Sequence, residues 1–480
     1  MKNTQSGISM TDLEEIKPFE SEAPLIIYID FKSPYAYLSV APTREMLSKL
    51  NVIADWRPFV LDIPSYLGSA KLDKGAKKVA KQIRTEVHWS GVKYAYFDCR
   101  RYANLSGMTI RGTVKIWNTD LPSIGMLWVK QFSDLAEQCE AGSLLERYID
   151  FIYDPFWKRE LDVEDPSVIL MVLEEIGAPT DGFLDYIKGK GFSLNEKLQK
   201  SAFDAGIYGV PTYILPDESV NDPKHEKFFG REHLPRISWL LSGRKGAAPS
   251  IAYNLPSQVD KEVLAKSATD QLPETRLPSD THKLKTFFDF NSAHSYLALE
   301  SIKAIKKEGI SIEWKPFPGK QLKAPDKELP EEDRGTKHRR IRSEYIANDI
   351  QRYAPHDLRD IYREADCQFA DMGLLWLQKK LKVDTDVVDS YVTRVFHHLW
   401  KDSGSVNTAS DIEKIIIELG ISVEGWNEYS KEIGLEHLEE VRSQIDPKTI
   451  NVTPVFFIGT EPFQGHSQLP LVIARLKSGI

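Results

Sequence analysis

The stretch LIIYIDFKSPYAYL at residues 25–38 returns later in the chain as LKTFFDFNSAHSYL at residues 284–297. In both copies an apolar run of strand length ends at Asp-Phe, and a serine two residues later begins a segment with helical character. A second strand is predicted at 52–59, which contains WRPF, and WKPF recurs at 314–317. The order strand, helix, strand predicts a β-α-β opening in each half of the chain.

The repetition continues in the same order downstream. DCRRYA at 98–103 recurs as DIQRYA at 349–354, and VPTY at 210–213 aligns with TPVF at 453–456. Several collinear matches in one chain indicate two copies of one α/β plan. We therefore expect both halves of the chain to have the same fold. The expected helix over 34–50 contains Pro42, which predicts a kink or a division there.

After its opening, each copy has a long middle section that is mainly helical in pattern. Helical spacing is clear at 144–152 and 166–176, so we expect a helical insertion. Near the end of the first copy, the sequence pattern predicts a strand at 211–215, a hairpin partner at 227–229 and a final helix at 234–241. The second copy ends in the same way, with a predicted strand at 454–458 and a predicted helix at 469–476.

The domain boundaries follow from the repeat and from the composition between the copies. Residues 246–283 are rich in Pro and Ser and show no sustained apolar period, which predicts an extended or loosely packed linker. We therefore expect an N-terminal tail at 1–23, a first domain at 24–245, the linker at 246–283 and a second domain at 284–480.

Composition excludes several classes of protein. The 480 residues include 62 Lys plus Arg and 70 Asp plus Glu, and the net charge of −8 gives no global field that attracts nucleic acid or an anionic membrane. No apolar run is long enough to span a bilayer, and no secretory signal is visible, which favours a soluble cytoplasmic protein. The three cysteines, Cys99, Cys139 and Cys367, are far apart and form neither a disulfide framework nor a metal site.

The motifs resemble a known family. DFKSPYAYL at 30–38, GVPT at 209–212 and FGREHL at 229–234 are similar to the branch of the DsbA-like thioredoxin fold that contains 2-hydroxychromene-2-carboxylate isomerases and kappa-class glutathione transferases. The resemblance implies an α/β fold of two tandem thioredoxin-like, DsbA-type domains, each with a helical insertion. It also implies glutathione as the cofactor.

In dithiol members of this fold the helix start carries Cys-x-x-Cys, whereas this chain has SPYA at 33–36 and SAHS at 292–295. Disulfide exchange cannot run without those thiols. A helix N-terminus favours an anion such as a thiolate, and the family resemblance implies that Ser33, with Tyr35 beside it, holds or activates the glutathione sulfur. Ser292 matches the family pattern only in the serine itself, so we expect a weaker catalytic site in the second copy.

The resemblance also implies a second part of the glutathione site. In this fold the X-Pro bond is cis, and the residue before it pairs with an extended peptide, which assigns cofactor contacts to Val210 with Pro211 and to Thr453 with Pro454. In the following loop the family often places an acid against the γ-glutamyl amine, and Glu232 is the candidate here. The second copy has Ser467 at that position.

The expected function is that of a glutathione-dependent isomerase or a kappa-like glutathione transferase acting on a conjugated or aromatic electrophile. In the isomerase reaction the thiolate adds to an enone-like acid, rotation follows, and elimination regenerates glutathione. A transferase would release the conjugate instead. The expected partner is a small-molecule substrate, and the two domains are expected to pair within one chain, which would make a monomer sufficient.

Each motif also has a simpler structural explanation. Serine is a common N-cap, and Pro34 suits the first turn of a helix, so capping alone accounts for the serine pattern. Asp98 and Arg101, at helical spacing of three, fit a helix-face ion pair as well as a pocket role. The alternative function is a non-catalytic thioredoxin-fold module that binds a peptide or a protein partner.

Overall fold

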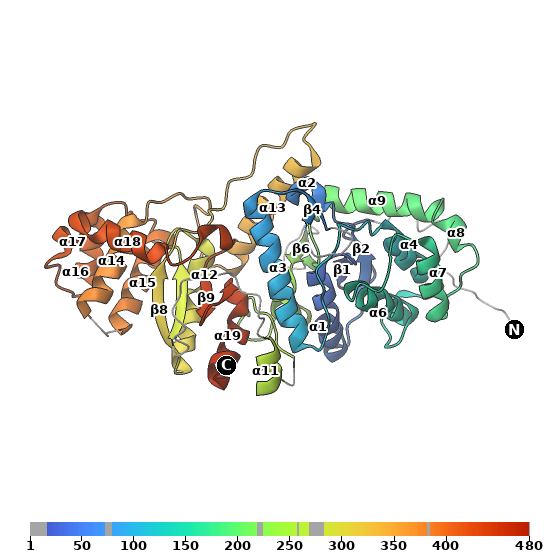
Figure 1. Ribbon diagram of the computed structural model, residues 1–480, viewed down its shortest axis with the longest axis horizontal. Coiled ribbons are helices and arrows are strands. Elements are labelled where there is room, and N and C mark those ends of the chain that lie inside the picture. Colours follow the sequence, from blue (N-terminus) through green and yellow to red (C-terminus); the bar gives the residue numbers. More distant parts are fainter. Residues whose placement is uncertain are drawn as a thin grey trace. The chain divides into compact units, whose positions relative to one another are not determined.

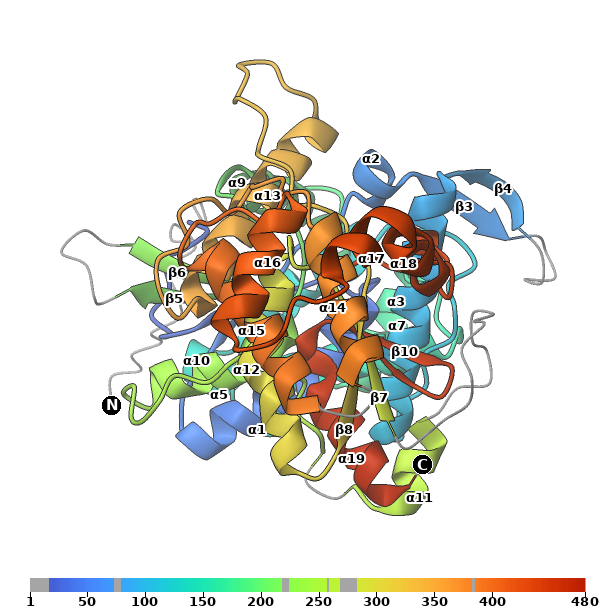
Figure 2. The same cartoon turned by 90° about the vertical axis from the view of Figure 1, so that its left-hand side faces the viewer.

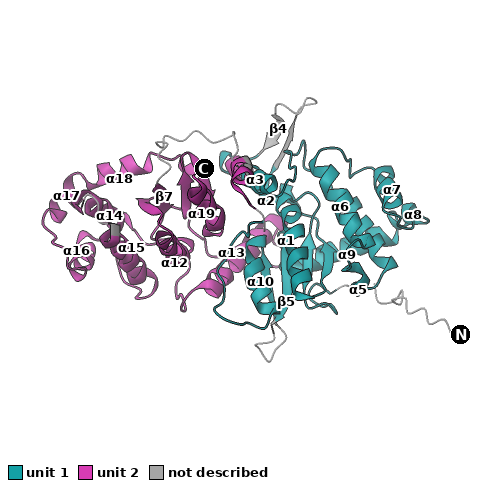
Figure 3. Cartoon of the chain, turned by 90° about the horizontal axis from the view of Figure 1, so that it is seen from below, with its two compact units in different colours: residues 1–88, 95–258 teal, residues 89–94, 259–480 magenta. Residues whose placement is uncertain are grey.

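The computed structural model describes residues 17–72, 79–217, 224–256, 259–267, 283–381 and 385–479. The chain divides into two compact units, one made of residues 1–88 and 95–258 and the other of residues 89–94 and 259–480 (Figure 3). Residues 1–16 of the predicted tail, and residues 257–258 and 268–282 of the predicted linker, lie outside the described residues. No helix in the described ranges is long and apolar enough to cross a membrane.

The first unit is built on a mixed four-stranded sheet with the order β2-β1-β5-β6. The central strand β1 is parallel to β2 and antiparallel to β5. Strand β5 forms an antiparallel hairpin with β6 (Figure 2). All four residues of β1 are buried, as expected for a strand covered on both faces. The strands are β1 (Ile26–Ile29), β2 (Asp55–Pro58), β5 (Thr212–Asp217) and β6 (Lys224–Phe229).

Helices fill most of the long section between β2 and β5 (Figure 1), which confirms the expected helical insertion. The helices of the first unit are α1 (Pro34–Leu50), α2 (Ile63–Leu67), α3 (Glu86–Leu105), α4 (Asp120–Val129), α5 (Leu135–Gln138), α6 (Leu144–Trp157), α7 (Pro166–Glu175), α8 (Phe183–Tyr186), α9 (Lys190–Asp204) and α10 (Leu234–Leu241), with short 3-10 turns at Lys130–Phe132 and Arg231–His233. Most of α3 belongs to this unit, but its residues 89–94 are grouped with the second.

The ends of α1 are fixed by the residues that flank it. Ser33 is the N-cap, and its hydroxyl accepts from the Ala36 N–H, while Asn51 takes a left-handed conformation at the C-terminus. The division of the helix expected at Pro42 does not occur, because α1 continues through it as one helix. Burial of the neighbouring residues holds the helix there, and the Thr43 hydroxyl lies 2.9 Å from the Tyr213 hydroxyl of β5.

Two expectations for the first unit need correction. The second strand begins at Asp55 rather than at Val52, because the Val52 N–H donates to the Leu47 carbonyl and so belongs to the end of α1. The helical insertion also contains a two-stranded antiparallel hairpin, β3 (Ser69–Leu72) with β4 (Val79–Ile83), that the sequence analysis did not predict.

The second unit has the same sheet plan. Its strand order, β10-β9-β7-β8, places β7 parallel to β8 and antiparallel to β9, as β1 is to β2 and β5. Its core includes a cluster of buried apolar side chains from the sheet and the segments beside it. The strands are β7 (Lys283–Phe288), β8 (Ser311–Pro316), β9 (Val455–Ile458) and β10 (Glu461–Gln464).

The helices of the second unit also lie mostly between the second and third strands of its sheet. They are α11 (Lys261–Ser267), α12 (Ala293–Lys307), α13 (Arg334–Tyr353), α14 (Gln368–Leu381), α15 (Thr385–Trp400), α16 (Ala409–Glu418), α17 (Trp426–Glu432), α18 (Gly434–Arg442) and α19 (Leu469–Ser478), with 3-10 turns at Pro447–Thr449 and His466–Gln468.

In each sheet, one buried carboxylate connects the loop after the first strand to the loop after the second. In the first unit, Asp30 follows β1 and accepts from the Leu61 N–H at 2.7 Å. In the second, Asp289 follows β7 and accepts from the Gly319 N–H at 2.8 Å. Each carboxylate therefore ties the loop after the first strand to the loop after the second, which explains why the Asp-Phe pair recurs in the sequence.

Candidate functional site

The N-terminus of α1 lies beside the loop that precedes β5. The Ser33 side chain is buried, and its hydroxyl accepts from the Ala36 N–H at 3.2 Å and lies 3.4 Å from the Val210 carbonyl, to which it donates. Two predicted site residues that are far apart in the sequence, Ser33 and Val210, are thus neighbours. The hydroxyl also serves as the N-cap, so the structural and the functional explanations of Ser33 apply to the same atom.

Both predicted X-Pro bonds are cis: Val210–Pro211 in the first unit and Thr453–Pro454 in the second. After each of them the chain forms a hairpin that returns to the proline. The Gly230 N–H donates to the Pro211 carbonyl at 2.9 Å, and the Gly465 N–H donates to the Pro454 carbonyl at 2.8 Å. The loop that follows the hairpin is therefore held against the proline in both units.

Packing explains the glycine of the Gly-Val-Pro motif. A Cβ atom at Gly209 would lie 2.5 Å from Cε2 of the Phe229 ring, closer than real Cβ contacts allow. Phe229 is the first residue of the Phe-Gly motif, so the two motifs meet in space. Gly230 has φ +111°, and Gly465 has φ +88°, a conformation that favours glycine.

Tyr35 points toward α3 and connects to a buried ion pair. Its hydroxyl donates to Asp98 Oδ2 at 3.3 Å, while Asp98 Oδ1 accepts from Arg101 Nη1 at 3.0 Å. The side chains of Asp98 and Arg101 are 2% and 0% exposed, so this pair is part of the interior and not a solvated helix face. It links the predicted cofactor residue Tyr35 to the helical insertion.

The second unit builds a related arrangement with different residues. His294 occupies the position of Tyr35, and Asp349 pairs with Arg352 on α13. Burial lowers the pKa of His294, and the Asp349 carboxylate opposes that shift. Ser292 caps α12 by accepting from the Ser295 N–H at 3.3 Å, as Ser33 caps α1. The predicted Thr453 lies against Gly319, where an added Cβ would be 2.7 Å from its hydroxyl oxygen.

Glu232, predicted to contact the γ-glutamyl amine, lies in the 3-10 turn after Gly230. Its carboxylate folds back over Gly230, since a Cβ there would be 2.2 Å from Glu232 Oε2. Its carbonyl accepts from the Ala252 N–H at 2.9 Å. The start of the predicted linker therefore packs against this loop of the first unit. The linker is also not extended throughout, because the helix α11 (Lys261–Ser267) lies within it. In the second unit the equivalent Ser467 is buried.

Three residues of this region were not found by sequence analysis. The guanidinium carbon of Arg231 lies 4.3 Å from the ring centre of Tyr102 and 4.5 Å from that of Tyr253. They come from the loop after β6, from α3 and from the predicted linker, so no local pattern links them. The only sequence signal is an isolated tyrosine in a Pro- and Ser-rich stretch.

A cavity of about 460 Å³ lies in the helical insertion of the first unit. Aromatic and arginine side chains line it, among them Trp117, Phe156, Trp157, Arg111 and Arg159. The helix α6, which supplies two of the aromatic rings, also carries Tyr153, whose hydroxyl donates to the Asp30 carbonyl at 2.9 Å. The cavity is thus built on the helix that contacts the end of β1.

The comparisons with known proteins identify the second unit. The model of the DSBA-like thioredoxin domain matches residues 283–477. Residues 283–477 form a DsbA-like thioredoxin domain. No curated protein matches the chain.

Several solved structures resemble part of the chain at low identity. A 2-hydroxychromene-2-carboxylate isomerase has 16% identity and a TM-score of 0.33, over 45% of this chain and 94% of its own. The cytosolic disulfide reductase DsbM from Pseudomonas aeruginosa, solved with GSH, has 13% identity and a TM-score of 0.30, over 41% and 98%. A thiol-disulfide exchange protein from Wolbachia pipientis has 14% identity and a TM-score of 0.26, over 43% and 87%.

None of the three cysteines occupies the helix starts at 33–36 and 292–295, where dithiol members carry Cys-x-x-Cys. Cys367 is buried at the start of α14, and burial, followed by nearby carboxylates, raises its pKa. In the first unit, burial raises the pKa of Cys99 well above its usual value, and burial also raises that of Cys139. A raised pKa keeps a thiol protonated and unreactive. Within the described ranges, no three His, Cys, Asp or Glu side chains form a group suited to a metal ion.

Proposed function

We propose that the chain is a glutathione-dependent isomerase of the 2-hydroxychromene-2-carboxylate isomerase type, or a kappa-like glutathione transferase, with the better site in the first unit. The proposal includes a tandem duplication, in which the first unit is a second DsbA-like domain. Its support is the shared strand order, the serine N-caps, the cis X-Pro bonds and the carboxylate ties of Asp30 and Asp289.

The observation that carries the proposal is the position of Ser33. A hydroxyl, rather than a thiol, lies at the N-terminus of a 17-residue helix and beside the Val210 carbonyl. The partial positive charge of a helix N-terminus stabilises an anion there. When bound, glutathione would supply a thiolate for addition to a conjugated double bond.

Different residues of this chain would bind different parts of glutathione and of the electrophile. Ser33 would donate to the sulfur, which requires its hydroxyl proton to leave the Val210 carbonyl, and the backbone of Val210 would pair with the cysteinyl unit. Glu232 would accept from the γ-glutamyl amine. The cavity of about 460 Å³, whose lining combines the rings of Trp117, Phe156 and Trp157 with two arginines and two acids, would admit a planar electrophile.

A second function is supported for the DsbA-like domain. It has Ala293 and His294 where the first unit has Pro34 and Tyr35, and a buried serine where the first unit has Glu232. This unit would bind a peptide or a protein partner along the X-Pro edge without catalysing a reaction.

Calorimetric titration with reduced glutathione tests the proposal, with Ser33→Ala and the matched Ser292→Ala variant. Both changes remove an N-cap, so each should destabilise its own unit by about 1 kcal/mol. Only Ser33→Ala should weaken glutathione binding and reduce the ultraviolet absorbance of the bound thiolate. Binding that is equal in all three proteins would refute the role of Ser33, and absence of binding to the unmodified protein would leave the peptide-binding function.

A further inference from the structure

Arg231 is a buried cation with two nitrogens that no other group satisfies. It is 7% exposed, and its Nε and Nη2 atoms have no hydrogen-bond partner among the residues that the structure describes. These two nitrogens form one edge of the guanidinium, and their N–H bonds point in nearly the same direction. That edge is the one that binds both oxygens of a carboxylate or phosphate group at once.

The nearby acids do not fill this role. Asp98 is occupied by Tyr35 and Arg101, and the Glu232 carboxylate folds back over Gly230. A buried guanidinium that lacks an anion is costly, whereas an oxyanion placed on its open edge would supply both the charge and the hydrogen bonds that are missing. The site is therefore complementary to a ligand that carries a carboxylate or a phosphate.

Two tyrosine rings enclose the guanidinium. Tyr102 and Tyr253 lie within 4.5 Å of its central carbon, and their ring centres are 5.1 Å apart at an interplanar angle of 70°. Cation–π contacts of this kind hold a guanidinium through its face and do not use its N–H bonds. Tyr102 belongs to the long helix α3, but Tyr253 lies in a segment without regular structure.

The segment that carries Tyr253 has no regular secondary structure. Residues 247–256 contain no helix or strand, and the Ala252 N–H donates to the Glu232 carbonyl, which ties the segment to the loop after β6. Nε and Nη2 of Arg231 are buried, so an anion can reach that edge only after a neighbouring group has moved. Tyr253 is the ring neighbour that lies outside regular structure.

We propose that Arg231 is an oxyanion-binding residue and that Tyr253 is a cover that the anion displaces. The anion is a carboxylate or a phosphate group. It would come from either of two sources, the carboxylate of a peptide-like ligand lying along Val210 or a free oxyanion. Arg231 is close to Val210, because Gly230 next to it bonds to the Pro211 carbonyl.

The test uses three probes: reduced glutathione, glutathione diethyl ester and inorganic phosphate. Each is titrated by calorimetry into the full chain and into its Arg231→Gln, Tyr253→Ala and Arg236→Gln variants. Arg236 is a matched control, because it also lies against an aromatic ring, that of Trp239, at 5.0 Å. Thermal unfolding of each variant shows whether it is folded. If Arg231→Gln does not fold, the effect of Tyr253→Ala on binding still tests the proposal.

We expect Arg231→Gln to weaken binding of the carboxylate or phosphate probe at least 10-fold and Arg236→Gln to leave it unchanged. Tyr253→Ala should strengthen binding several-fold, because the cover no longer competes with the anion. If glutathione is the source, the diethyl ester should bind to the unmodified protein as weakly as glutathione binds to Arg231→Gln.

The outcomes separate this inference from the proposed function. Glutathione binding that depends on Ser33 but not on Arg231 would overturn the inference and leave the proposed function standing. Phosphate binding that depends on Arg231, without any glutathione binding, would support the inference and remove the proposed function. If no probe binds in an Arg231-dependent way, even to Tyr253→Ala, the anion site does not exist.

Discussion

The Tyr35 hydroxyl donates to Asp98 across 3.3 Å and thereby joins the start of α1 to the middle of α3. Asp98 holds this position because its other oxygen accepts from Arg101 at 3.0 Å, with both charges removed from solvent. The second unit has the corresponding pair, Asp349 and Arg352, but there the side chains are 19% and 16% exposed. The two pairs therefore share a geometry and differ in burial. Comparing the loss of stability when each pair is broken isolates the effect of burial.

Asp98→Asn should destabilise the first unit strongly. It removes the carboxylate that pairs with the buried Arg101 cation, and removing one member of a buried pair typically costs about 3–5 kcal/mol. Asp349→Asn should cost less than that, because its pair is partly exposed. Urea unfolding of both variants, followed by tryptophan fluorescence, provides the comparison. Equal losses in the two variants would show that burial of the Asp98 pair carries no energetic weight.

Gly209→Ala should destabilise the loop that holds the proposed peptide-binding backbone. The new methyl group would lie 2.5 Å from the Phe229 ring, and relieving such overpacking typically costs about 1–3 kcal/mol. The double variant Gly209→Ala with Phe229→Leu should recover part of that loss, because the smaller side chain makes room. Thermal unfolding measures both. A double variant that is as unstable as the sum of the two single variants would argue against the contact.

Asp371 should make the DsbA-like domain less stable as the pH rises. Burial raises the pKa of this carboxyl to about 8, against the opposing effect of Arg442, whose Nη2 lies 2.9 Å away. Its usual pKa is near 3.8, so the folded domain holds a proton that the unfolded chain releases between about pH 4 and pH 8. Its contribution to stability is complete below about pH 4 and declines up to about pH 8.

Asp371→Asn should therefore flatten the fall of stability between about pH 5 and pH 8, because an amide cannot lose that proton. Denaturant unfolding at several pH values measures the slope. The exposed Glu364→Gln is the control and should retain the slope of the unmodified protein. A slope that persists in Asp371→Asn would assign the pH dependence to another group.

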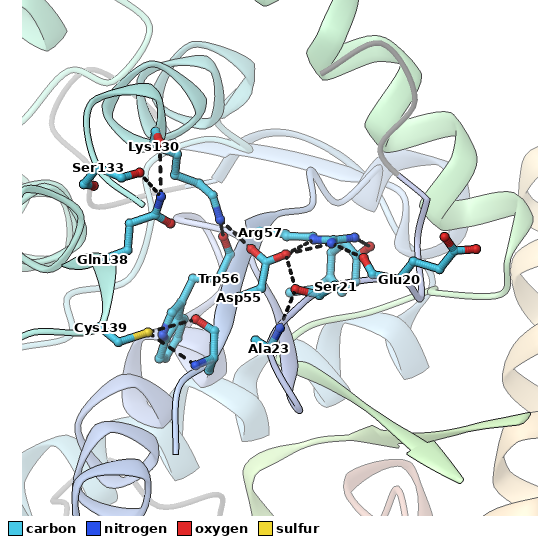
Figure 4. Close-up of polar contacts among 12 residues, drawn as sticks. Glu20, Ser21, Ala23, Asp55, Trp56, Arg57, Lys130, Ser133, Gln138 and Cys139 are labelled. Atoms are coloured by element: carbon cyan, nitrogen blue, oxygen red, sulfur yellow. Dashed lines mark hydrogen bonds and ion pairs between the residues drawn. The ribbon is translucent and has the colours of Figure 1, made fainter. Parts of the chain in front are cut away.

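Asp55 should have the opposite effect in the first unit. It accepts from Lys130 at 2.5 Å and from Arg57 at 2.8 Å (Figure 4). Burial alone would raise the pKa of Asp55, but these two cations lower it to about 2. Its contribution of about 2 kcal/mol is present above about pH 4 and is lost as the pH falls toward 2. Acid unfolding of Asp55→Asn should lack this step, and a step of unchanged size would refute the assignment.

Local patterns predicted much of the fold. The helix over 34–50 has the predicted bounds because a serine cap and a left-handed asparagine fix its two ends. The hairpin β3–β4 was missed because its lysine-rich sequence has no clear strand alternation. Pro42 was overinterpreted, since the packing of α1 against the sheet outweighs one absent N–H.

The candidate site was predictable only where its residues lie in short motifs. Ser33 and Val210 were identified from such motifs, and the structure places them 3.4 Å apart. Arg231, Tyr102 and Tyr253 come together only through tertiary packing, so no spacing within the sequence indicates them. The burial of Asp98 was equally invisible, because a spacing of three predicts an ion pair and not its exposure.

The carboxylate ties of Asp30 and Asp289 have a consequence for how such chains can change. Each tie joins two loops that are complete before the helical insertion begins, so the opening of the sheet does not depend on what the insertion contains. The first unit accordingly carries the β3–β4 hairpin between its second strand and α3, while the described residues 317–333 at the same place in the second unit have neither helix nor strand. The start of the sheet, held by these contacts, and the insertion can therefore evolve at different rates. An insertion exchanged between homologues at these loops would leave the Asp30 and Asp289 contacts intact.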